Sequence, residues 1–409
     1  MRRLALAGGE PAFPDGLPFV RPARPELDRV TARLRPSYDR GVLTNGPLVR
    51  ELEEVAAGRL DVPHVVAVSS CTAGLMLAVQ AVLTPGRSVV MPSFTFSATA
   101  HAAAWAGGRP RFVDCDGDDC LADPGEVAAA LDAGDVAAAM VTHTFGAPAH
   151  PDRVDALAAA RGVPVVYDAA HAFGSTHGGR PVGGSGAAEV FSLTPTKPLV
   201  AGEGGLVATR DGALAERLRQ GRDYGNPGDY DTRFVGLNAR QSELHAAVAL
   251  ESLVDFDDNL ARRQELAGRY REALAGVPGV RTQVLAAGDT STWKDLTIIV
   301  DADAYGVPRD RLRAALAAEG IDTRCYFDPP VHRQTSHRAA GRGAPDLPRT
   351  DRLAASVISL PIWPALSDAA VDRVAGVIGD VHEQAAAVAT EAASRSARWL
   401  VWRWTGGSK

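Results

Sequence analysis

Short apolar runs alternate with alanine-rich stretches from about Val65 to Val207, and this alternation constrains the fold more than any other feature. The runs expected to form strands are Val65–Val68, Ser88–Met91, Arg111–Val113, Ala137–Thr142, Pro164–Tyr167, Val190–Ser192 and Leu206–Ala208. The stretches expected to form helices are Ala73–Leu83, Ala98–Trp105, Pro124–Leu131 and Asp152–Ala160. Short continuous strands separated by helices predict an α/β fold with a mostly parallel sheet covered by helices on both faces.

The rest of the chain has a different pattern. We expect a long helix from Ser242 through Leu253 that continues after a break to Leu274. The later elements expected are a strand over Leu296–Val300, a helix over Arg309–Glu319, a strand over Val357–Leu360 and a helix over Asp368–His382 capped by Ser367. A chain of 409 residues is long enough for two domains. We therefore expect a large domain over 1–255 that includes an N-terminal arm, a smaller α+β domain over 256–385, and a tail over 386–409.

Charge and cysteine usage exclude several classes of protein. The net charge of −6 argues against a surface that coats nucleic acid, although a local basic pocket for a phosphorylated substrate stays open. The cysteines are Cys71, Cys115, Cys120 and Cys325, and their spacing fits neither a zinc site nor a redox pair. We expect inert thiols and no metal.

Neither end of the chain predicts a membrane protein. Met1–Gly9 is basic, but its apolar stretch is too short for a secretory signal. No segment approaches the ~20 apolar residues that span a bilayer. The segment Arg398–Trp404 is basic and rich in tryptophan, and it could touch a membrane surface, but docking on a partner subunit or a loose end is the more common use. We expect a cytoplasmic protein.

The candidate site centres on Lys197. Upstream, the apolar run Val163–Tyr167 delivers Asp168 at the end of an expected strand, and the glycine-rich run Gly202–Gly205 follows the lysine. A lysine amine that forms a Schiff base, together with a carboxylate that keeps a pyridine nitrogen protonated, is what pyridoxal phosphate (PLP) chemistry requires. Pro198 disfavours helical geometry at the lysine and suits a side chain that projects from a loop. A surface lysine in a polar loop is the ordinary alternative.

A phosphate site is expected where Val66–Gly74 passes from a strand into a helix. This segment places the hydroxyl of Thr72 and free backbone N–H groups at a helix start, which favours a phosphate. An ordinary Ser/Thr cap explains the same residues equally simply. Ser192, at another strand end, could add a second hydroxyl.

Two further segments could contact the cofactor ring. Pro92–Thr99 contains phenylalanines, one of which could stack on a pyridine, although core packing explains a phenylalanine equally well. His171 lies three residues after Asp168 and could hydrogen-bond the 3-oxygen of PLP. A lone histidine is more often a core or surface group.

These segments occur in a specific order. They are Gly41–Pro47, Ser69–Leu75, Pro92–Phe96, Asp168–Gly174, Ser192–Lys197, Glu203–Gly205, Gly236–Arg240 and Pro330–His332. In this order the chain resembles the DegT/DnrJ/EryC1/StrS group, the sugar aminotransferases of the fold-type I PLP superfamily. The resemblance extends from about Gly41 to Pro361. It implies a large domain with a mostly parallel seven-stranded sheet and a smaller α+β domain.

The resemblance also implies roles for individual residues. Lys197 would be the Schiff-base lysine, Asp168 the partner of the pyridine nitrogen, and Phe96 the stacking ring. Thr72, Ala73 and Ser192 would bind the phosphate. His171 would lie near the 3-oxygen.

Asn238 would reach the phosphate of the neighbouring subunit's cofactor, so the resemblance implies a homodimer with shared active sites. The chain departs from the commonest form of the family at Cys71, Tyr167, Leu193–Thr194 and Pro198. Each departure could reshape the substrate side of the pocket, and none removes a catalytic group. Because some members that are dehydratases carry a histidine in place of the lysine, Lys197 favours transamination.

The implied reaction moves an amino group from L-glutamate to a keto-sugar nucleotide. The segment Tyr167–Gly174 looks closest to members that act on C4 of a dTDP-4-keto-6-deoxyhexose, in amino-sugar and antibiotic biosynthesis. Candidates for the sugar-diphosphate end are His332, Tyr326, Arg324 and Tyr224, for which structural roles are equally plausible.

Other functions stay open. Leu4–Pro11 resembles the opening of relatives that aminate ketocyclitols or form aminobenzoates with glutamine. A regulator that binds PLP without turnover is the alternative from another class, although the chain shows no basic helix-turn-helix segment. A nicotinamide-dependent Rossmann enzyme is disfavoured because no G-x-G-x-x-G follows an early strand.

Overall fold

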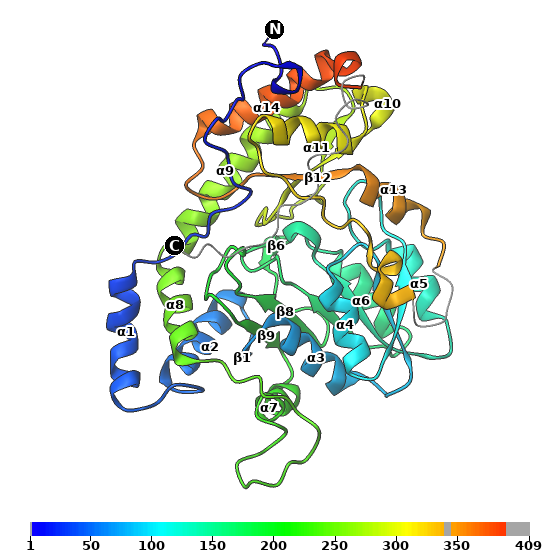
Figure 1. Cartoon of the computed structure of the whole chain (residues 1–409). Helices are drawn as coiled ribbons and strands as arrows, with labels where there is room; N and C mark the ends of the chain where they lie inside the picture. The colour runs from blue at the N-terminus through cyan, green and yellow to red at the C-terminus, as the bar shows by residue number, and fades with distance from the viewer. Residues whose placement is uncertain (1, 339–344, 390–409) are drawn as a thin grey trace.

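The lower lobe in Figure 1 is built on a seven-stranded sheet, as expected from the sequence. The computed structural model describes residues 2–338 and 345–389. The strands are β1 (His64–Val68), β2 (Ser88–Pro92), β3 (Arg109–Val113), β4 (Val136–Thr142), β5 (Val165–Asp168), β8 (Ala188–Ser192) and β9 (Gly205–Thr209), in the order β1-β9-β8-β5-β4-β2-β3. Only β9 runs against its neighbours in this sheet. The predicted α/β fold with a mostly parallel sheet is confirmed.

Helices cover both faces of this sheet because alternate strand residues point to opposite sides. On one face, Val66 and Val68 pack against α3 (Cys71–Val82), α4 (Ser97–Trp105) and α7 (Gly212–Gly221). On the other face lie α2 (Pro47–Leu60) and α8 (Glu243–Val254) at one end and α5 (Pro124–Leu131) and α6 (Pro151–Ala159) at the other. The sequence analysis did not foresee α2, α7 or α1 (Leu27–Asp39), which packs on α8.

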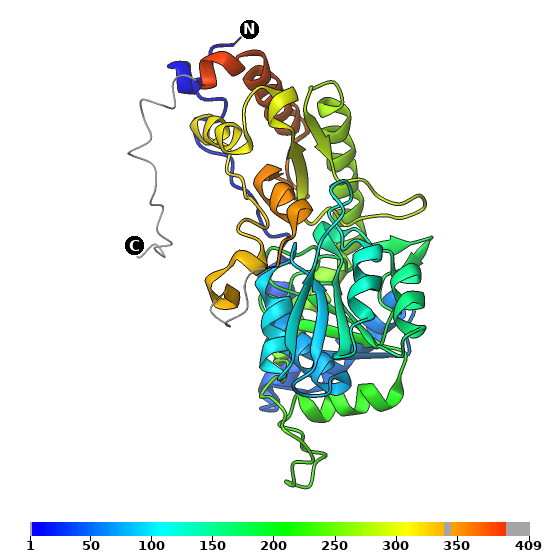
Figure 2. The same ribbon diagram turned by 90° about the vertical axis from the view of Figure 1, so that its right-hand side faces the viewer.

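The upper lobe in Figures 1 and 2 is a second layer of helices on a small antiparallel sheet. Its strands and helices are β10 (Val280–Thr282), β11 (Leu296–Val300), β12 (Val357–Leu360), α9 (Phe256–Leu274), α10 (Ala302–Tyr305), α11 (Arg309–Ala318), α13 (Pro348–Ser356) and α14 (Asp368–Glu383). The long helix breaks at Asp255, between α8 and α9, as expected. Ser367 caps α14 by accepting a hydrogen bond from the Ala370 N–H.

Short elements complete the description. They are the β6 (Thr176–His177) and β7 (Arg180–Pro181) hairpin, α12 (Thr335–Arg338), and the 3₁₀ turns Ala5–Ala7, Thr144–Gly146 and Val331–Arg333. No helix in the described ranges is long and apolar enough to cross a membrane. The tryptophan-rich segment Arg398–Trp404 lies outside the described residues.

The N-terminal arm, which we grouped with the large domain, packs against the upper lobe. Leu4 and Ala12 are buried in the same apolar core as α9, α11 and α14. The carboxylate of Glu319, at the end of α11, accepts hydrogen bonds from the backbone N–H groups of Ala5 and Ala12, each at 2.7 Å. The arm and the upper lobe therefore form one packed unit, while the domain boundaries themselves stay a proposal.

Candidate active site

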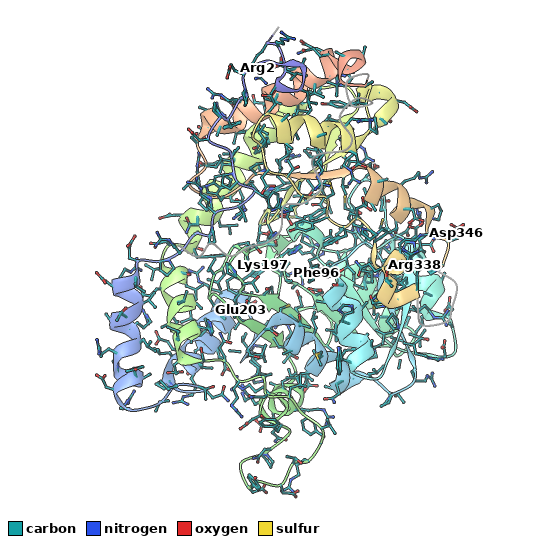
Figure 3. All side chains as sticks on the ribbon, in the orientation of Figure 1. Arg2, Phe96, Lys197, Glu203, Arg338 and Asp346 are labelled. Atoms are coloured by element: carbon teal, nitrogen blue, oxygen red, sulfur yellow. The ribbon has the colours of Figure 1, made fainter. Side chains whose placement is uncertain are left out.

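A cavity of ≈ 340 Å³ lies where the carboxyl ends of β5 and β8 meet the start of α3, with residues of the upper lobe closing one side. Figure 3 shows Lys197 and Phe96 at the level where the lobes meet, with Glu203 below them. The polar and aromatic residues that line the cavity are Ser70, Thr72, Phe96, Thr142, Asp168, His171, Ser192, Thr194, Thr196, Lys197, Glu203, Lys294, Asp295, Tyr326 and Phe327. Ligands collect at this edge of a parallel sheet.

Lys197 enters the cavity from the turn after β8. Its backbone N–H donates to the carbonyl of Thr194 at 3.0 Å, which closes the turn. Burial, followed by the nearby charge of Lys294, lowers the pKa of Lys197 to about 8, against the smaller opposite effects of Asp295, Cys71 and Asp168. A larger share of this amine is therefore neutral and nucleophilic near neutral pH than of an ordinary lysine.

Asp168 ends β5 and is held in a fixed orientation. It is 3% exposed, and its Oδ2 accepts a hydrogen bond from the Thr99 hydroxyl at 2.6 Å, while its Oδ1 accepts from the Ala170 N–H at 3.1 Å. Burial raises the pKa of Asp168, and these hydrogen bonds and the charge of Lys197 oppose that effect. A buried carboxylate in this position is stabilised by a positively charged partner such as a pyridinium N–H.

His171 is held as a neutral ring. Its Nδ1 accepts a hydrogen bond from the Phe145 N–H at 3.1 Å, so the ring proton lies on Nε2. Burial and the charges of Lys197 and Lys294 keep the pKa of His171 well below its ordinary value. The ring can therefore donate one hydrogen bond into the cavity.

The start of α3 contributes hydroxyl groups. Ser70 is its N-cap and accepts from the Ala73 N–H at 3.1 Å, and the neighbouring Thr72 lines the cavity. Gly205 lets β9 approach this turn, because a Cβ at Gly205 would lie 2.7 Å from the amide nitrogen of Cys71. The Ser192 hydroxyl lies 3.3 Å from that of Thr194.

The structure thus brings together most of the residues singled out from the sequence, and leaves five outside the cavity lining. Those five are Ala73, whose N–H is used by the Ser70 cap, and Asn238, His332, Arg324 and Tyr224. Of the four proposed substrate residues, only Tyr326 lines the cavity.

The excluded residues have other partners. His332 is completely buried, with its Nδ1 2.6 Å from the Ser93 hydroxyl and its Nε2 3.3 Å from Asp351, so it has no surface to offer a sugar diphosphate. Arg324 pairs with Asp322 on the surface. Tyr224 is half exposed beneath the guanidinium of Arg240, and Asn238 is exposed.

The sequence analysis did not assign roles to Glu203, Lys294 and Asp295, which line the cavity, or to Thr99, whose hydroxyl donates to Asp168. One signal could have found Lys294: only three of the 43 basic residues are lysines, and two of them line this cavity. Thr99 gave no comparable signal, because only the packing of α4 over β5 brings its hydroxyl to Asp168. Among the described residues, no group of three His, Cys, Asp or Glu could hold a metal ion.

The arrangement fits PLP. The buried amine of Lys197, with its lowered pKa, would take the aldehyde, the buried carboxylate of Asp168 would take the ring nitrogen, and the hydroxyls at the start of α3 would take the phosphate. Phe96 is 58% exposed at the mouth of the cavity, where a free ring face is available for stacking. The chemistry that this site supports is reaction at a carbon next to an amine.

Residues 26–379 match the model of one protein family, which is described as "DegT/DnrJ/EryC1/StrS aminotransferase family". A curated relative from Streptomyces venezuelae, the dTDP-3-amino-3,4,6-trideoxy-alpha-D-glucose transaminase, is 34% identical over 365 residues, which is 88% of this chain and 93% of the relative.

Two solved structures share the whole fold. DesI, crystallised in the presence of its TDP-sugar product, superposes with a TM-score of 0.88 at 38% identity, covering 94% of this chain and 98% of DesI. The S. venezuelae enzyme DesV, in complex with a ketimine intermediate, gives a TM-score of 0.82 at 33% identity, covering 87% of this chain and 95% of DesV.

Proposed function

The chain belongs to the DegT/DnrJ/EryC1/StrS aminotransferase family and is a PLP-dependent transaminase, and from this premise we propose that it transfers an amino group from L-glutamate to C4 of a dTDP-4-keto-6-deoxyhexose. The observation that carries the proposal is the pairing of the buried Lys197 amine with the buried Asp168 carboxylate in one cavity. The likeness to DesI and to the S. venezuelae transaminase supports a nucleotide-linked sugar as acceptor.

The cofactor residues follow from the cavity. Lys197 would hold the PLP aldehyde, Asp168 the ring nitrogen and Phe96 one ring face. PLP, when bound, supplies a carbonyl that condenses with amines and a ring that withdraws electrons from the substrate carbon. His171 would donate its Nε2 proton to the 3-oxygen, and Thr72 and Ser192 would donate their hydroxyl protons to the phosphate.

Lys197 also moves the proton. Its neutral Nζ would accept the proton from the α-carbon of the amino donor and pass it to the cofactor, and in the second half-reaction it would carry a proton from the cofactor to the sugar carbon that receives the amine. The lowered pKa suits both tasks, because a base with a pKa near the working pH can accept and return the proton. Asp168 holds the ring nitrogen protonated throughout.

The acceptor carbon is the part of the proposal most in need of a test. The name of the S. venezuelae relative places its amino group at C3, so C3 and C4 keto-sugars both belong in the trial. Purified enzyme with PLP would be incubated with a panel of keto-sugar nucleotides and a ketocyclitol, each with either L-glutamate or L-glutamine, and the products identified by mass spectrometry and NMR. We expect amination of the 4-keto sugar with glutamate; turnover of a ketocyclitol with glutamine would replace the proposal with the cyclitol alternative.

Leu4–Pro11, the segment that suggested the cyclitol alternative, has a structural role. It belongs to the arm that packs against α11, and none of its residues lines the cavity. The segment therefore favours neither acceptor. A cytoplasmic location stays a prediction, which cell fractionation would test.

We also propose that two copies share their active sites. Asn238 is exposed and outside its own cavity, with its backbone paired to that of Asp223, so its side chain is available to a second copy. Exposed apolar side chains on α1 and α8, among them Leu27, Leu244 and Val254, offer a surface for that copy.

Subunit complementation tests the shared site. Lys197→Ala and Asn238→Ala are each expected to be strongly impaired. A mixture of the two refolded together would contain mixed dimers in which one site has both native residues, so about a quarter of wild-type activity should return. No recovery from a dimeric mixture would show that Asn238 serves its own subunit.

A further inference from the structure

Lys294 is the cation of the cavity that the proposed cofactor contacts do not use. Among the described residues that line the cavity, Lys197 and Lys294 are the two with cationic side chains. The chain uses arginine for nearly all its other cations, with three lysines among 43 basic residues. The lysine places a compact charge with three N–H donors here, in contrast to the planar guanidinium that the chain uses elsewhere.

The segment that carries Lys294 is fixed to the lower lobe before it enters β11. The Lys294 N–H donates to the carbonyl of Phe145 at 3.1 Å, and the Thr292 hydroxyl donates to the carbonyl of His171 at 2.5 Å. The backbone of Trp293 is left-handed, with φ of 48°. The indole ring is buried in the core of the upper lobe, and this packing holds the backbone in that conformation. The ammonium is therefore pre-organised beside the residues proposed to hold the cofactor.

Lys294 lies beside one buried carboxylate and near a second buried cation. Its Nζ lies 2.7 Å from Oδ1 of Asp295, and both side chains are buried. The same carboxylate attracts the buried guanidinium of Arg263, whose pKa is lowered to about 10 by burial and raised by Asp295. Asp295 thus pairs with Lys294 and also acts through space on the Arg263 charge, so these three groups together carry one net positive charge, while Asp168 and Glu203 are the other carboxylates that line the cavity.

Aromatic rings enclose that charge. The Lys294 ammonium lies 5.5 Å from the ring centroid of Tyr326 and 5.9 Å from that of Phe19. Rings in these positions exclude water and strengthen any electrostatic contact that the ammonium makes. After its contact with Asp295, the ammonium still has two N–H donors.

We propose that Lys294 binds the α-carboxylate of the amino donor. In an α-amino acid one carbon separates the reacting nitrogen from the carboxylate, so the cation that holds the carboxylate has to lie near Lys197, as Lys294 does. The diphosphate of a sugar nucleotide lies several bonds from the reacting carbon and needs a cation further away. This inference rests on the proposed transamination and identifies which group recognises the donor.

The two half-reactions test the inference. In Lys294→Met the side chain keeps its length and loses its charge, and we expect roughly a 10²-fold rise in the apparent Kd for L-glutamate. The apparent Kd of the pyridoxamine-phosphate form for the keto-sugar should change less than about threefold. The α-amide of L-glutamate should bind wild type and variant alike, because it lacks the carboxylate that Lys294 recognises. A comparable loss of affinity for the keto-sugar, or an equal loss of affinity for glutamate and for its α-amide, overturns the inference.

Two controls separate this role from folding. Because Lys294→Met leaves the Asp295 carboxylate without its lysine, Lys294→Met/Asp295→Asn is measured beside it and should show the same selective loss for glutamate. Arg180→Gln removes an exposed cation paired with Asp152 and should leave both half-reactions unchanged.

A binding measurement makes the result independent of turnover. Calorimetric titration of the PLP-loaded protein with maleate, a dicarboxylate that cannot be transaminated, should give binding to wild type that is lost in Lys294→Met. Loss of binding in a protein that aminates no sugar would contradict the proposed acceptor and support the carboxylate site. Equal binding by wild type and variant would overturn the role of Lys294 whatever the acceptor is.

Discussion

At the scale of single residues, burial and neighbouring charges decide the chemistry of the site. Lys197, Asp168 and His171 are all buried, and burial shifts the pKa of each toward its neutral form. Hydrogen bonds and opposite charges then oppose the shift for Asp168, while the charge of Lys294 adds to it for Lys197. The fold thus favours the neutral form of the Lys197 amine, and it orients the Asp168 carboxylate through hydrogen bonds from two donors.

The lowered pKa of Lys197 predicts the pH dependence of PLP attachment. Only the neutral amine reacts, so the rate at which the apo-protein captures PLP should rise as pH rises through about 8 and level off above it. An ordinary lysine, with a pKa of about 10.4, would still be gaining rate at pH 9. Stopped-flow absorbance between pH 6 and 10 measures the profile. Removing the Lys294 charge should move the midpoint to higher pH; a midpoint above pH 10 in wild type would contradict the assignment.

Replacing Lys197 or Asp168 should separate attachment from catalysis. Lys197→Ala should abolish both the absorbance of covalently bound PLP and turnover. Asp168→Asn should still bind PLP, since the amide oxygen can accept from Thr99, but should lower kcat by roughly 10²–10⁴-fold because the ring nitrogen loses its anionic partner. Spectra and steady-state kinetics of both variants check this, and full activity in Asp168→Asn would rule out the proposed role.

At the scale of elements, the close approach of β9 to the start of α3 shapes the phosphate side of the cavity. Gly205 is the first residue of β9 and lies directly behind Ser70 and Cys71. A Cβ at this position would lie 2.7–2.9 Å from the backbone atoms of these two residues. Backbone cannot move aside as a flexible side chain can, so the turn itself would have to shift. Gly205, in the glycine-rich run behind Lys197, therefore acts on the start of α3.

Gly205→Ala should accordingly weaken both the fold and PLP binding. We expect a loss of about 1–3 kcal/mol in the free energy of unfolding from overpacking, and a higher Kd for PLP because the start of α3 moves. Gly58, inside α2, has nothing within 4 Å of an added Cβ, so Gly58→Ala is the matched control and should stabilise by about 0.5–1 kcal/mol. Denaturant unfolding and PLP titration of both variants give the comparison. Equal behaviour of the two would show that the approach at Gly205 is not limiting.

At the scale of the whole molecule, the N-terminal arm ties the first residues to the upper lobe across more than 300 positions. The buried carboxylate of Glu319 receives the N–H groups of Ala5 and Ala12, and the guanidinium of Arg2 lies 2.8 Å from it. Because the upper lobe closes the cavity with Lys294 and Tyr326, the residues that Glu319 holds act on the site through the lobe that they stabilise, whereas Phe19, further along the chain, lies directly against Lys294.

Glu319→Ala should therefore release the arm without touching the chemistry. Two buried N–H groups would lose their acceptor, which costs about 2–4 kcal/mol in the free energy of unfolding. Limited proteolysis should cut the arm sooner, while kcat at a temperature well below Tm stays close to wild type. A variant as resistant to proteolysis as wild type would show that burial of Leu4 and Ala12 suffices to hold the arm.

The sequence by itself determined the strands of the large sheet and the two residues at the centre of the candidate site. Strand-length apolar runs and alanine-rich stretches predicted all seven strands of the large sheet, because a strand buried on both faces must be apolar along its whole length. Lys197 and Asp168 were identifiable because each follows such a strand, and the edge where parallel strands end is where ligands bind.

Only the tertiary structure decided which distant residues complete the site. His332 and Arg324 were candidates for substrate residues in sequence; the structure leaves both outside the cavity lining and shows contacts to Ser93 and Asp322 that become visible only after folding. Lys294 and Asp295 lie about 100 residues beyond Lys197 and reach it because the upper lobe folds back over the sheet. Sequence patterns report local periodicity and burial, whereas the pairing of charges across lobes depends on packing that no local pattern encodes.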